Sequence, residues 1–308
     1  MRLRVVYFGM GGIFSRPPLA ALIARDSVQV VGVVVPRPGG MTMPDSGTAR
    51  IDPPARYVTD IPLQKAASER NIIGLAWDAG IPVFEVAVLS HPHTLAMLSS
   101  LAPEVICVAC FPKLLPRPII QLPTRAALNL HPALLPAYRG PAPLFWIFHD
   151  GLEHAGITLH QLGTRADRGD IVAQTAVALP AGIGYSAAER MCAEEGARLL
   201  VGALDDIRAG TFTHAPQPAA DTPLAPQPTD ADFILTPDWS ARRAFNFIRG
   251  VAEWDREIVL QIGGERYAVR RAIAYADSEP RQVPLEQMGG EWKVRCSPGT
   301  LRCTLSRL

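Results

Sequence analysis

The sequence has little cysteine, almost no net charge and no long apolar run. Its 5 cysteines among 308 residues are too few, and odd in number, for a disulfide-stapled secreted scaffold, so we expect a protein of the reducing cytoplasm. Apolar runs such as Val30–Val35 fall far short of the roughly 20 residues that span a bilayer. A formal net charge of +1 is not typical of proteins that bind polyanions through a general positive field.

Composition and length predict a globular protein of two domains. Hydrophobic residues make up 48% of the chain and charged residues 19%, which excludes intrinsic disorder. His214–Asp230 contains five prolines among seventeen residues with little apolar pattern, which is typical of a semi-rigid linker. At about 150 residues per domain, we expect a first domain over residues 1–210, a Pro-rich linker over 211–230 and a second domain over 231–308.

The amino-terminal two thirds of the chain alternate short β-rich runs with longer helical patterns. This alternation predicts an α/β domain with a Rossmann-like, mostly parallel sheet covered by helices. The expected strands are Leu3–Phe8, Val28–Val35, Val83–Phe84, Val105–Ala109, Ala126–His131, Ile157–Gln161 and Ile171–Val177. The expected helices are Pro17–Arg25, Ala66–Ala79 and Ser186–Arg208. Ser15 stands where a helix cap is needed, and Gly80 where a helix ends in the left-handed conformation.

The segment after the Pro-rich linker has mainly β character. A short helix over Ser240–Val251 precedes Ile258–Ile262, a Gly263-Gly264 turn and Tyr267–Ala274, whose spacing predicts a hairpin. Trp292–Cys296 and Leu301–Leu305 continue the β pattern. We therefore expect a small, mainly β second domain.

Two patterns that can indicate a metal are weak in this sequence. Cys107 and Cys110 spell C-x-x-C, but they lie in an apolar run and no second pair stands at zinc-ligand spacing, so we interpret both as buried strand residues. His91 and His93 form an H-x-H pair, but no acidic or cysteine cluster stands nearby to complete a metal site. We expect no metal site.

A glycine cluster, Gly9–Gly12, follows the first strand where a dinucleotide fingerprint would lie. Phe14 occupies the position of the third glycine, and no acidic residue ends the second strand to bind a ribose. Arg37 can meet a 2′-phosphate, so an NADP-dependent oxidoreductase stays an alternative. A tight turn beside a ligand crevice fits the pattern better.

Asn129 and His131 end a predicted strand of the sheet. Side chains two residues apart in a strand share a face, and ligands of open α/β sheets bind at the carboxyl ends of strands. Asp167 lies in a polar loop between two later strands, and a carboxylate beside an imidazole favours its charged form and selects its tautomer. These residues together predict acid–base chemistry, whereas alone each is explained by a structural histidine or a turn aspartate.

Several segments carry a resemblance to a known family, and they run from the predicted catalytic strand into the second domain. They are Asn129-Leu130-His131-Pro132, Leu134-Leu135-Pro136, Tyr138-Arg139-Gly140, Ala142-Pro143, Gly156–His160, Arg165–Gln174 and Asp238-Trp239-Ser240 with the hairpin that follows. The chain resembles the 10-formyltetrahydrofolate-dependent formyltransferases, both the methionyl-tRNA branch and the amino-sugar N-formyltransferases. The resemblance covers most of the chain and implies a catalytic formyltransferase domain followed by a small OB-like domain.

The resemblance implies transfer of a formyl group from 10-formyltetrahydrofolate, as co-substrate, to a primary amine, without a metal or a covalent enzyme intermediate. It places the catalytic roles on Asn129, His131 and Asp167. The implied donor contacts are Lys113, Leu114, Leu115, Ala133, Leu134, Leu135, Pro136, Gly163, Thr164, Arg165, Ala166 and Asp167. The chain departs from the family pattern at Ala133, where serine is frequent, and at Glu253-Trp254-Asp255 in the second domain.

Charge favours a small-molecule acceptor over tRNA. The segment Pro36–Gln64 carries three arginines and three aspartates, and residues 209–308 carry twelve basic and twelve acidic side chains. Phosphate binding along tRNA depends on clustered lysine and arginine. We therefore expect an amino sugar nucleotide or an amine of specialised metabolism as the acceptor. The alternatives are methionyl-tRNA formylation and a folate- or nucleotide-binding module without catalysis.

Overall fold

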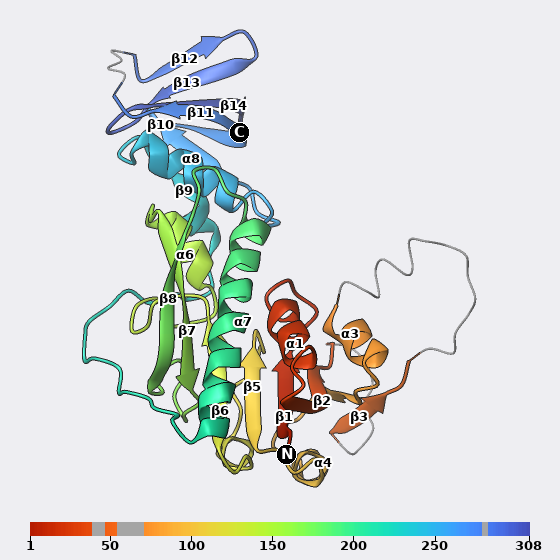
Figure 1. Cartoon of the computed structure of the whole chain (residues 1–308). Helices are drawn as coiled ribbons and strands as arrows, with labels where there is room; N and C mark the ends of the chain where they lie inside the picture. Colours follow the sequence, from red (N-terminus) through yellow and green to blue (C-terminus); the bar gives the residue numbers. More distant parts are fainter. Residues whose placement is uncertain (39–46, 54–70, 279–282) are drawn as a thin grey trace. The chain divides into compact units, whose positions relative to one another are not determined.

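The computed structural model describes residues 1–38, 47–53, 71–278 and 283–308 (Figure 1). The chain forms two compact units, each assembled from three stretches of sequence. Unit 1 comprises Met1–Arg139, Gly156–Thr175 and Arg190–Thr222, and unit 2 comprises Gly140–Ala155, Ala176–Glu189 and Pro223–Leu308. The two units do not test the domain boundaries expected after residues 210 and 230. Those boundaries stay a prediction. Over the described ranges, no helix combines the length and the apolar character needed to cross a membrane.

The larger sheet has eight strands in the order β3-β4-β2-β1-β5-β6-β7-β8. The strands are β1 (Leu3–Gly9), β2 (Val28–Pro36), β3 (Thr48–Ile51), β4 (Val83–Val86), β5 (Val105–Ala109), β6 (Ala126–His131), β7 (His154–Gln161) and β8 (Ile171–Ala178). β4, β2, β1, β5 and β6 pair in parallel, whereas β3 and β7 run antiparallel to β4 and β6. The predicted Rossmann-like, mostly parallel α/β sheet is confirmed.

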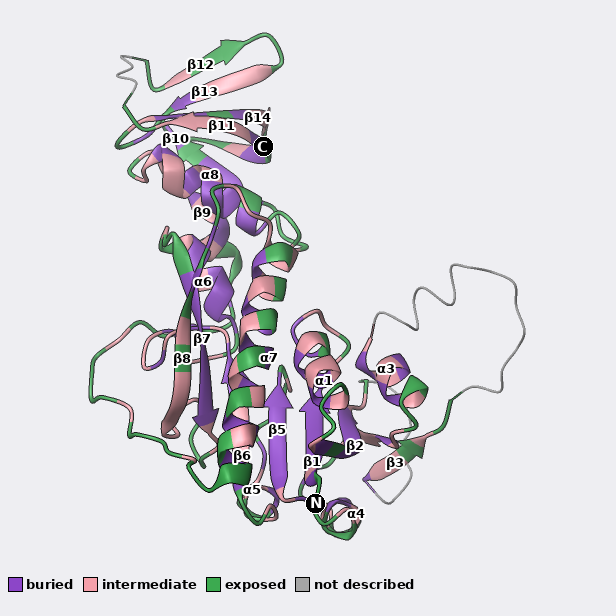
Figure 2. Ribbon diagram, in the orientation of Figure 1, coloured by how far each residue is buried: buried purple, intermediate pink, exposed green. Residues whose placement is uncertain are grey.

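The core of unit 1 is built on the central strands β1 and β5, which are buried along almost their whole length (Figure 2). A parallel sheet covered on both faces needs continuous apolar runs, which explains the sequence Val105–Ala109. The strand order reverses between β1 and β5, the place where open α/β sheets bind ligands. Because β5 pairs with β6, Asn129 and His131, at the carboxyl end of β6, lie one strand away from this reversal.

The helices that accompany the larger sheet confirm the expected end at Gly80 but not the expected cap at Ser15. They are α1 (Arg16–Ile23), α3 (Ile72–Asp78), α4 (Pro92–Ser100), α5 (Arg117–Ile120) and α7 (Tyr185–Ala209). Gly80 ends α3 with a φ of 69°, as expected, while the predicted start at Ala66 lies outside the described residues. The prediction that the Ser15 side chain caps α1 is wrong. Its hydroxyl instead accepts from the Met10 amide at 3.1 Å and donates to the Ala109 carbonyl at 2.7 Å, joining the ends of β1 and β5.

The interpretation of both C-x-x-C cysteines as buried strand residues is right for one of them. Cys107 is buried in β5, and burial raises the pKa of its thiol. Cys110 is exposed, because β5 ends at Ala109 and the chain turns there with a φ of 56° at Cys110. Among the described residues, no group of three or more histidine, cysteine or acidic side chains is arranged to hold a metal.

Unit 2 contains the second, mostly antiparallel sheet, with strand order β12-β13-β14-β11-β10-β9. Its elements are α6 (Pro143–His149), η1 (Asp230–Phe233), β9 (Ile234–Leu235), α8 (Ala241–Gly250), β10 (Val259–Ile262), β11 (Glu265–Ala276), β12 (Leu285–Met288), β13 (Glu291–Arg295) and β14 (Thr300–Arg307). The predicted hairpin is confirmed by the antiparallel pairing of β10 with β11 around Gly263 and Gly264, which have φ values of 61° and 82°. Ser240 caps α8 by accepting from the Arg243 amide at 3.2 Å.

Candidate active site

The register between β6 and β7 gathers four polar side chains on one face of the sheet. Asn129 pairs with His160, and His131 pairs with Thr158. Directly opposed residues of an antiparallel pair project from the same face, so the two pairs form one cluster. His131 is 4% exposed, His160 is 1% exposed and Thr158 is fully buried. Buried polar groups are nearly always hydrogen-bonded. The partners of each ring nitrogen therefore indicate which nitrogens of His131 and His160 carry a proton.

His160 is held as a neutral imidazole that orients Asn129. Its Nδ1 lies 2.8 Å from the Gln161 carbonyl oxygen, which only accepts, so Nδ1 carries the proton. Nε2 then accepts from the Asn129 amide nitrogen at 3.0 Å. Burial, together with the charge of His131, lowers the pKa of His160 to about 4, although the Gln161 carbonyl and Asp167 act in the opposite direction. One Asn129 N–H is thereby fixed on His160, and the second N–H is not used by that bond.

The depressed pKa of His160 predicts a loss of stability in mild acid. Between pH 6.5 and about 4 the unfolded chain binds the His160 proton and the native chain does not, so the free energy of unfolding falls as pH falls. The expected contribution is roughly 1.4 kcal/mol per pH unit within that window. Urea titrations from pH 7 to pH 4.5 should show this slope in the wild type and its loss in His160→Gln. The exposed-histidine variant His93→Gln is the control, and an equal slope in wild type and His160→Gln contradicts the assignment.

The His131 ring is oriented so that one nitrogen faces Asp167. Its Nε2 lies 2.8 Å from the Tyr138 carbonyl oxygen, and this nitrogen therefore carries a proton in both charge states of the ring. Its Nδ1 lies 3.7 Å from Oδ1 of Asp167. The same carboxylate oxygen is 3.8 Å from Nε2 of His160, but neutral His160 offers it no proton there. His131 Nδ1 is thus the atom through which this pair can exchange a proton.

Asp167 is positioned by its backbone. It has a φ of 53°, in the left-handed region where aspartate is tolerated. Its carbonyl oxygen accepts from Gln217 Nε2 at 2.8 Å and from Arg139 Nε at 3.3 Å. A Cβ at Gly169 would lie 1.7 Å from the Gln161 carbonyl oxygen, so only glycine allows the loop to return this closely to β7. The loop conformation is therefore fixed on both sides of the carboxylate.

The first part of the segment expected to be a semi-rigid linker is fastened to unit 1. Ala215 forms a bridge with Ile171, and Gln217 donates to the carbonyl oxygens of Asp167 and Gly169, both at 2.8 Å. The Oε1 atom of Gln217 also accepts from Arg139 at 2.6 Å. The sequence analysis did not predict a site role for Gln217. No local pattern indicates one, because its partners are about fifty and about eighty positions away.

Two further polar residues of the site were missed, although a pattern pointed to them. Thr158 and His160 repeat, on the neighbouring strand, the two-residue spacing of Asn129 and His131. Thr158 Oγ1 donates to the Ala133 carbonyl at 2.6 Å and accepts from the Leu135 amide at 3.1 Å. Gln174 donates to the Leu135 carbonyl at 2.7 Å and to Thr158 at 2.8 Å. These bonds anchor the segment that follows His131.

The expected donor-contact residues lie on three segments of unit 1 with different exposure. Leu115, Ala133 and Leu135 bury their side chains in the core, so a bound donor would meet their backbone. Leu114, in contrast, is 69% exposed, and an exposed leucine on the loop after β5 suits contact with the flat rings of a folate. The loop residues Gly163–Ala166 are exposed as well. These donor contacts stay predictions.

Residues 4–204 match the family model described as formyl transferase. The chain belongs to the formyl transferase family. Methionyl-tRNA formyltransferase of Pelotomaculum thermopropionicum is 32% identical over 252 residues, covering 82% of this chain and 73% of that protein. As a family member, the protein is a 10-formyltetrahydrofolate-dependent N-formyltransferase, with the folate as donor co-substrate.

Two solved structures share the fold over nearly the whole chain. The N-formyltransferase from Helicobacter canadensis, in complex with folinic acid and dTDP-3-aminofucose, superposes with a TM-score of 0.63 at 13% identity, covering 100% of both chains. HypX from Aquifex aeolicus, in complex with tetrahydrofolic acid, gives a TM-score of 0.54 at 14% identity, covering 98% of this chain and 44% of HypX. The formyltransferase chain thus spans less than half the length of HypX.

The sequence left open an NADP-dependent oxidoreductase and a binding module without catalysis. Membership of the formyl transferase family argues against both. The oxidoreductase interpretation relied on Arg37 for a 2′-phosphate. Arg37 instead forms an ion pair with Glu85 at 3.4 Å, with side chains only 14% and 20% exposed. Gly9 is the last residue of β1, and a Cβ there would come within 2.9 Å of the Tyr7 ring, so close packing requires glycine at this position. The tight turn expected over Gly9–Gly12 stays a prediction.

Proposed function

We propose that this formyltransferase acts on the primary amine of a small molecule and that Asn129, His131 and Asp167 carry the chemistry. The observation on which the proposal depends is the 3.7 Å approach of Asp167 Oδ1 to His131 Nδ1 in a buried cluster. We place the reaction in the cytoplasm, as the sparse and odd set of cysteines predicts.

Asn129 is proposed to stabilise the oxygen that becomes negative during the reaction. Attack of the amine on the formyl carbon moves an electron pair onto the formyl oxygen. The Asn129 amide has one N–H fixed on His160 at 3.0 Å, which leaves the other N–H in a defined direction for that oxygen. Such a preorganised donor typically contributes about 100- to 1000-fold in rate.

His131 and Asp167 are proposed to move the protons. The attacking amine loses a proton as the new C–N bond forms, and the folate nitrogen gains one as its bond to the formyl carbon breaks. His131 exchanges the proton at Nδ1, because its Nε2 proton is held by the Tyr138 carbonyl. Asp167 stabilises the imidazolium that forms. Acid–base catalysis of this kind typically contributes about 10²- to 10⁴-fold.

The acceptor is proposed from the charge of the chain. Twelve basic residues are balanced by twelve acidic residues over 209–308, so the second domain supplies no net positive field for a tRNA. One observation favours methionyl-tRNA as a second candidate, namely the 32% identity to the P. thermopropionicum enzyme. The two candidates differ in size and in the number of phosphates bound, which makes them separable by experiment.

A mass-spectrometric screen of amines tests the proposed acceptor class. With 10-formyltetrahydrofolate present, we expect a small amine, including amino sugar nucleotides in the panel, to gain one formyl unit and tetrahydrofolate to be released in equal amount. Filter binding of initiator tRNA at low and high salt runs in parallel. Tight, salt-sensitive tRNA binding with formylation of the charged tRNA overturns the small-molecule proposal.

A further inference from the structure

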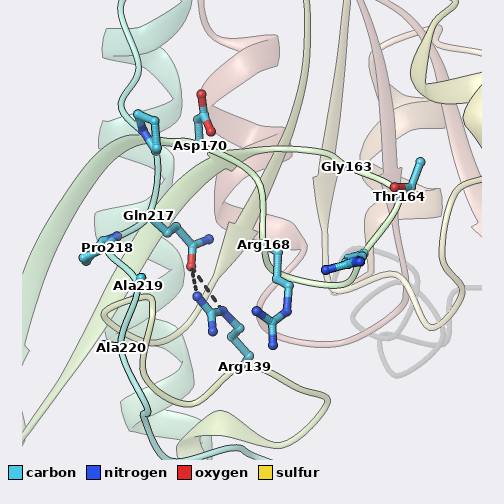
Figure 3. Close-up of a pocket in the computed structure, with 11 residues that line it drawn as sticks. Arg139, Gly163, Thr164, Arg168, Asp170, Gln217, Pro218, Ala219 and Ala220 are labelled. Atoms are coloured by element: carbon cyan, nitrogen blue, oxygen red, sulfur yellow. Dashed lines mark hydrogen bonds between the residues drawn. The ribbon is translucent and has the colours of Figure 1, made fainter.

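A cavity of about 610 Å³ borders the loop that carries Asp167 and lies within unit 1. Arg168 and Asp170 line it from the loop, and Arg139 and Gln217 line it from two other segments. Gly163, Thr164 and Arg165 line it too, and these three residues are also among the expected folate contacts, so donor and acceptor compete for the assignment of this cavity. In Figure 3 the side chains of Arg139 and Arg168 extend toward the same space, between the loop and the segment that carries Gln217. The volume falls within the roughly 300–1,000 Å³ that is typical of small-molecule sites.

The cavity lining carries an excess of positive charge. Three arginines face one carboxylate, and that carboxylate, Asp170, lies 2.8 Å from Nδ1 of His214. The hydrogen-bond acceptors of Arg139 are neutral, the Asp167 carbonyl at 3.3 Å and Gln217 Oε1 at 2.6 Å. These bonds fix the guanidinium in place without neutralising it.

Arg139 and Arg168 lie close enough for their positive charges to repel each other. Burial lowers the pKa of Arg139, the positive charge of Arg168 lowers it further, and Asp167 only partly opposes both effects. A protein tolerates like charges held together where a ligand of opposite charge relieves the repulsion. Guanidinium groups suit phosphate in particular, because they can donate two parallel hydrogen bonds to it.

We infer that this cavity binds a phosphate or diphosphate group of the formyl acceptor. This inference rests on the proposed function, because it assumes a small acceptor whose amine reaches His131. Asp167 directs its carboxylate to His131, and the next residue, Arg168, lines the cavity. The cavity lining includes neither His131 nor Asp167, so the inference requires the acceptor to extend from Arg168 to an amine site beside Asp167. Binding energy from this remote group would hold the amine in position for attack.

Titration calorimetry with inorganic pyrophosphate tests the site without requiring turnover. We expect the full-length wild type to bind pyrophosphate, more weakly as salt is added, and Arg168→Ala to bind it about tenfold more weakly. Arg168→Glu should abolish binding by reversing the charge. The control is Arg198→Ala, which removes an exposed arginine that pairs with Glu195 on α7, away from the cavity lining. Thermal unfolding confirms that each variant folds.

Two results overturn the inference. The first is pyrophosphate binding that is absent from the wild type at low salt or equal in wild type and Arg168→Glu. The second is evidence that the cavity binds the donor instead. In that case Arg168→Glu binds a poly-γ-glutamyl folate more weakly than the wild type does, while its pyrophosphate binding is unchanged.

A kinetic comparison links the cavity to the acceptor. For a phosphorylated acceptor and its dephosphorylated form, the ratio of their kcat/KM values should fall about tenfold in Arg168→Ala. An unchanged ratio contradicts the assignment of this cavity to the acceptor. If no small amine is formylated, the proposed function fails, whereas the pyrophosphate titration still reports on the cavity. The two failures are therefore distinguishable.

Discussion

Replacing His131 by alanine is expected to lower kcat for formyl transfer by about 10²- to 10⁴-fold. The variant loses the atom, Nδ1, that lies 3.7 Å from the Asp167 carboxylate. It also leaves the buried Tyr138 carbonyl without the donor now 2.8 Å away, which should cost about 1–3 kcal/mol of stability. The release of tetrahydrofolate at saturating donor and acceptor measures the first effect, and urea unfolding measures the second.

The control for His131 is an exposed histidine on the same unit. His93, on α4, is exposed, and His93→Ala should keep the wild-type rate. A His131→Ala enzyme that folds and retains a rate within a few-fold of wild type removes His131 from the mechanism. Comparing the two variants shows whether the loss of rate is specific to the His131 imidazole or follows from removing any histidine of unit 1.

Asp167→Asn is expected to lower kcat by a similar factor, about 10² or more, with little change in stability. Asparagine keeps the size of the side chain and tolerates the left-handed backbone, with φ of 53°, that the loop requires. The carbonyl contacts of residue 167 with Gln217 and Arg139 are backbone contacts and survive the substitution. What is lost is the negative charge that stabilises the His131 imidazolium.

A double variant shows whether the pair acts as one unit. If Asp167 acts only by stabilising the His131 imidazolium, His131→Ala/Asp167→Asn should be no slower than the slower single variant. Multiplication of the two single effects would instead mean that the residues act independently. Asp205→Asn, which removes an exposed carboxylate paired with Arg25, should leave kcat unchanged and is the matched control.

Much of the fold could be predicted from local sequence pattern. Val105–Ala109 and Ala126–His131 are strands with the bounds expected from sequence, and the Gly263-Gly264 turn joins two paired strands. These features depend on neighbouring residues, on the apolar run of a buried strand or on glycines that permit positive φ. Where a second element competes for the same group, local pattern failed. The Ser15 hydroxyl, for example, bonds to the end of β5 rather than to its own helix.

The sequence by itself determined that Asn129 and His131 share one face at the end of a strand, because side chains alternate along every strand. It also indicated the family, through the run from Asn129 to Gln174. Only the tertiary structure decided which residues complete the cluster. His160 meets Asn129 through an antiparallel register, and Gln217 fixes the Asp167 loop from a segment fifty residues away. Such contacts depend on how distant strands align and where a loop returns, which no local spacing encodes.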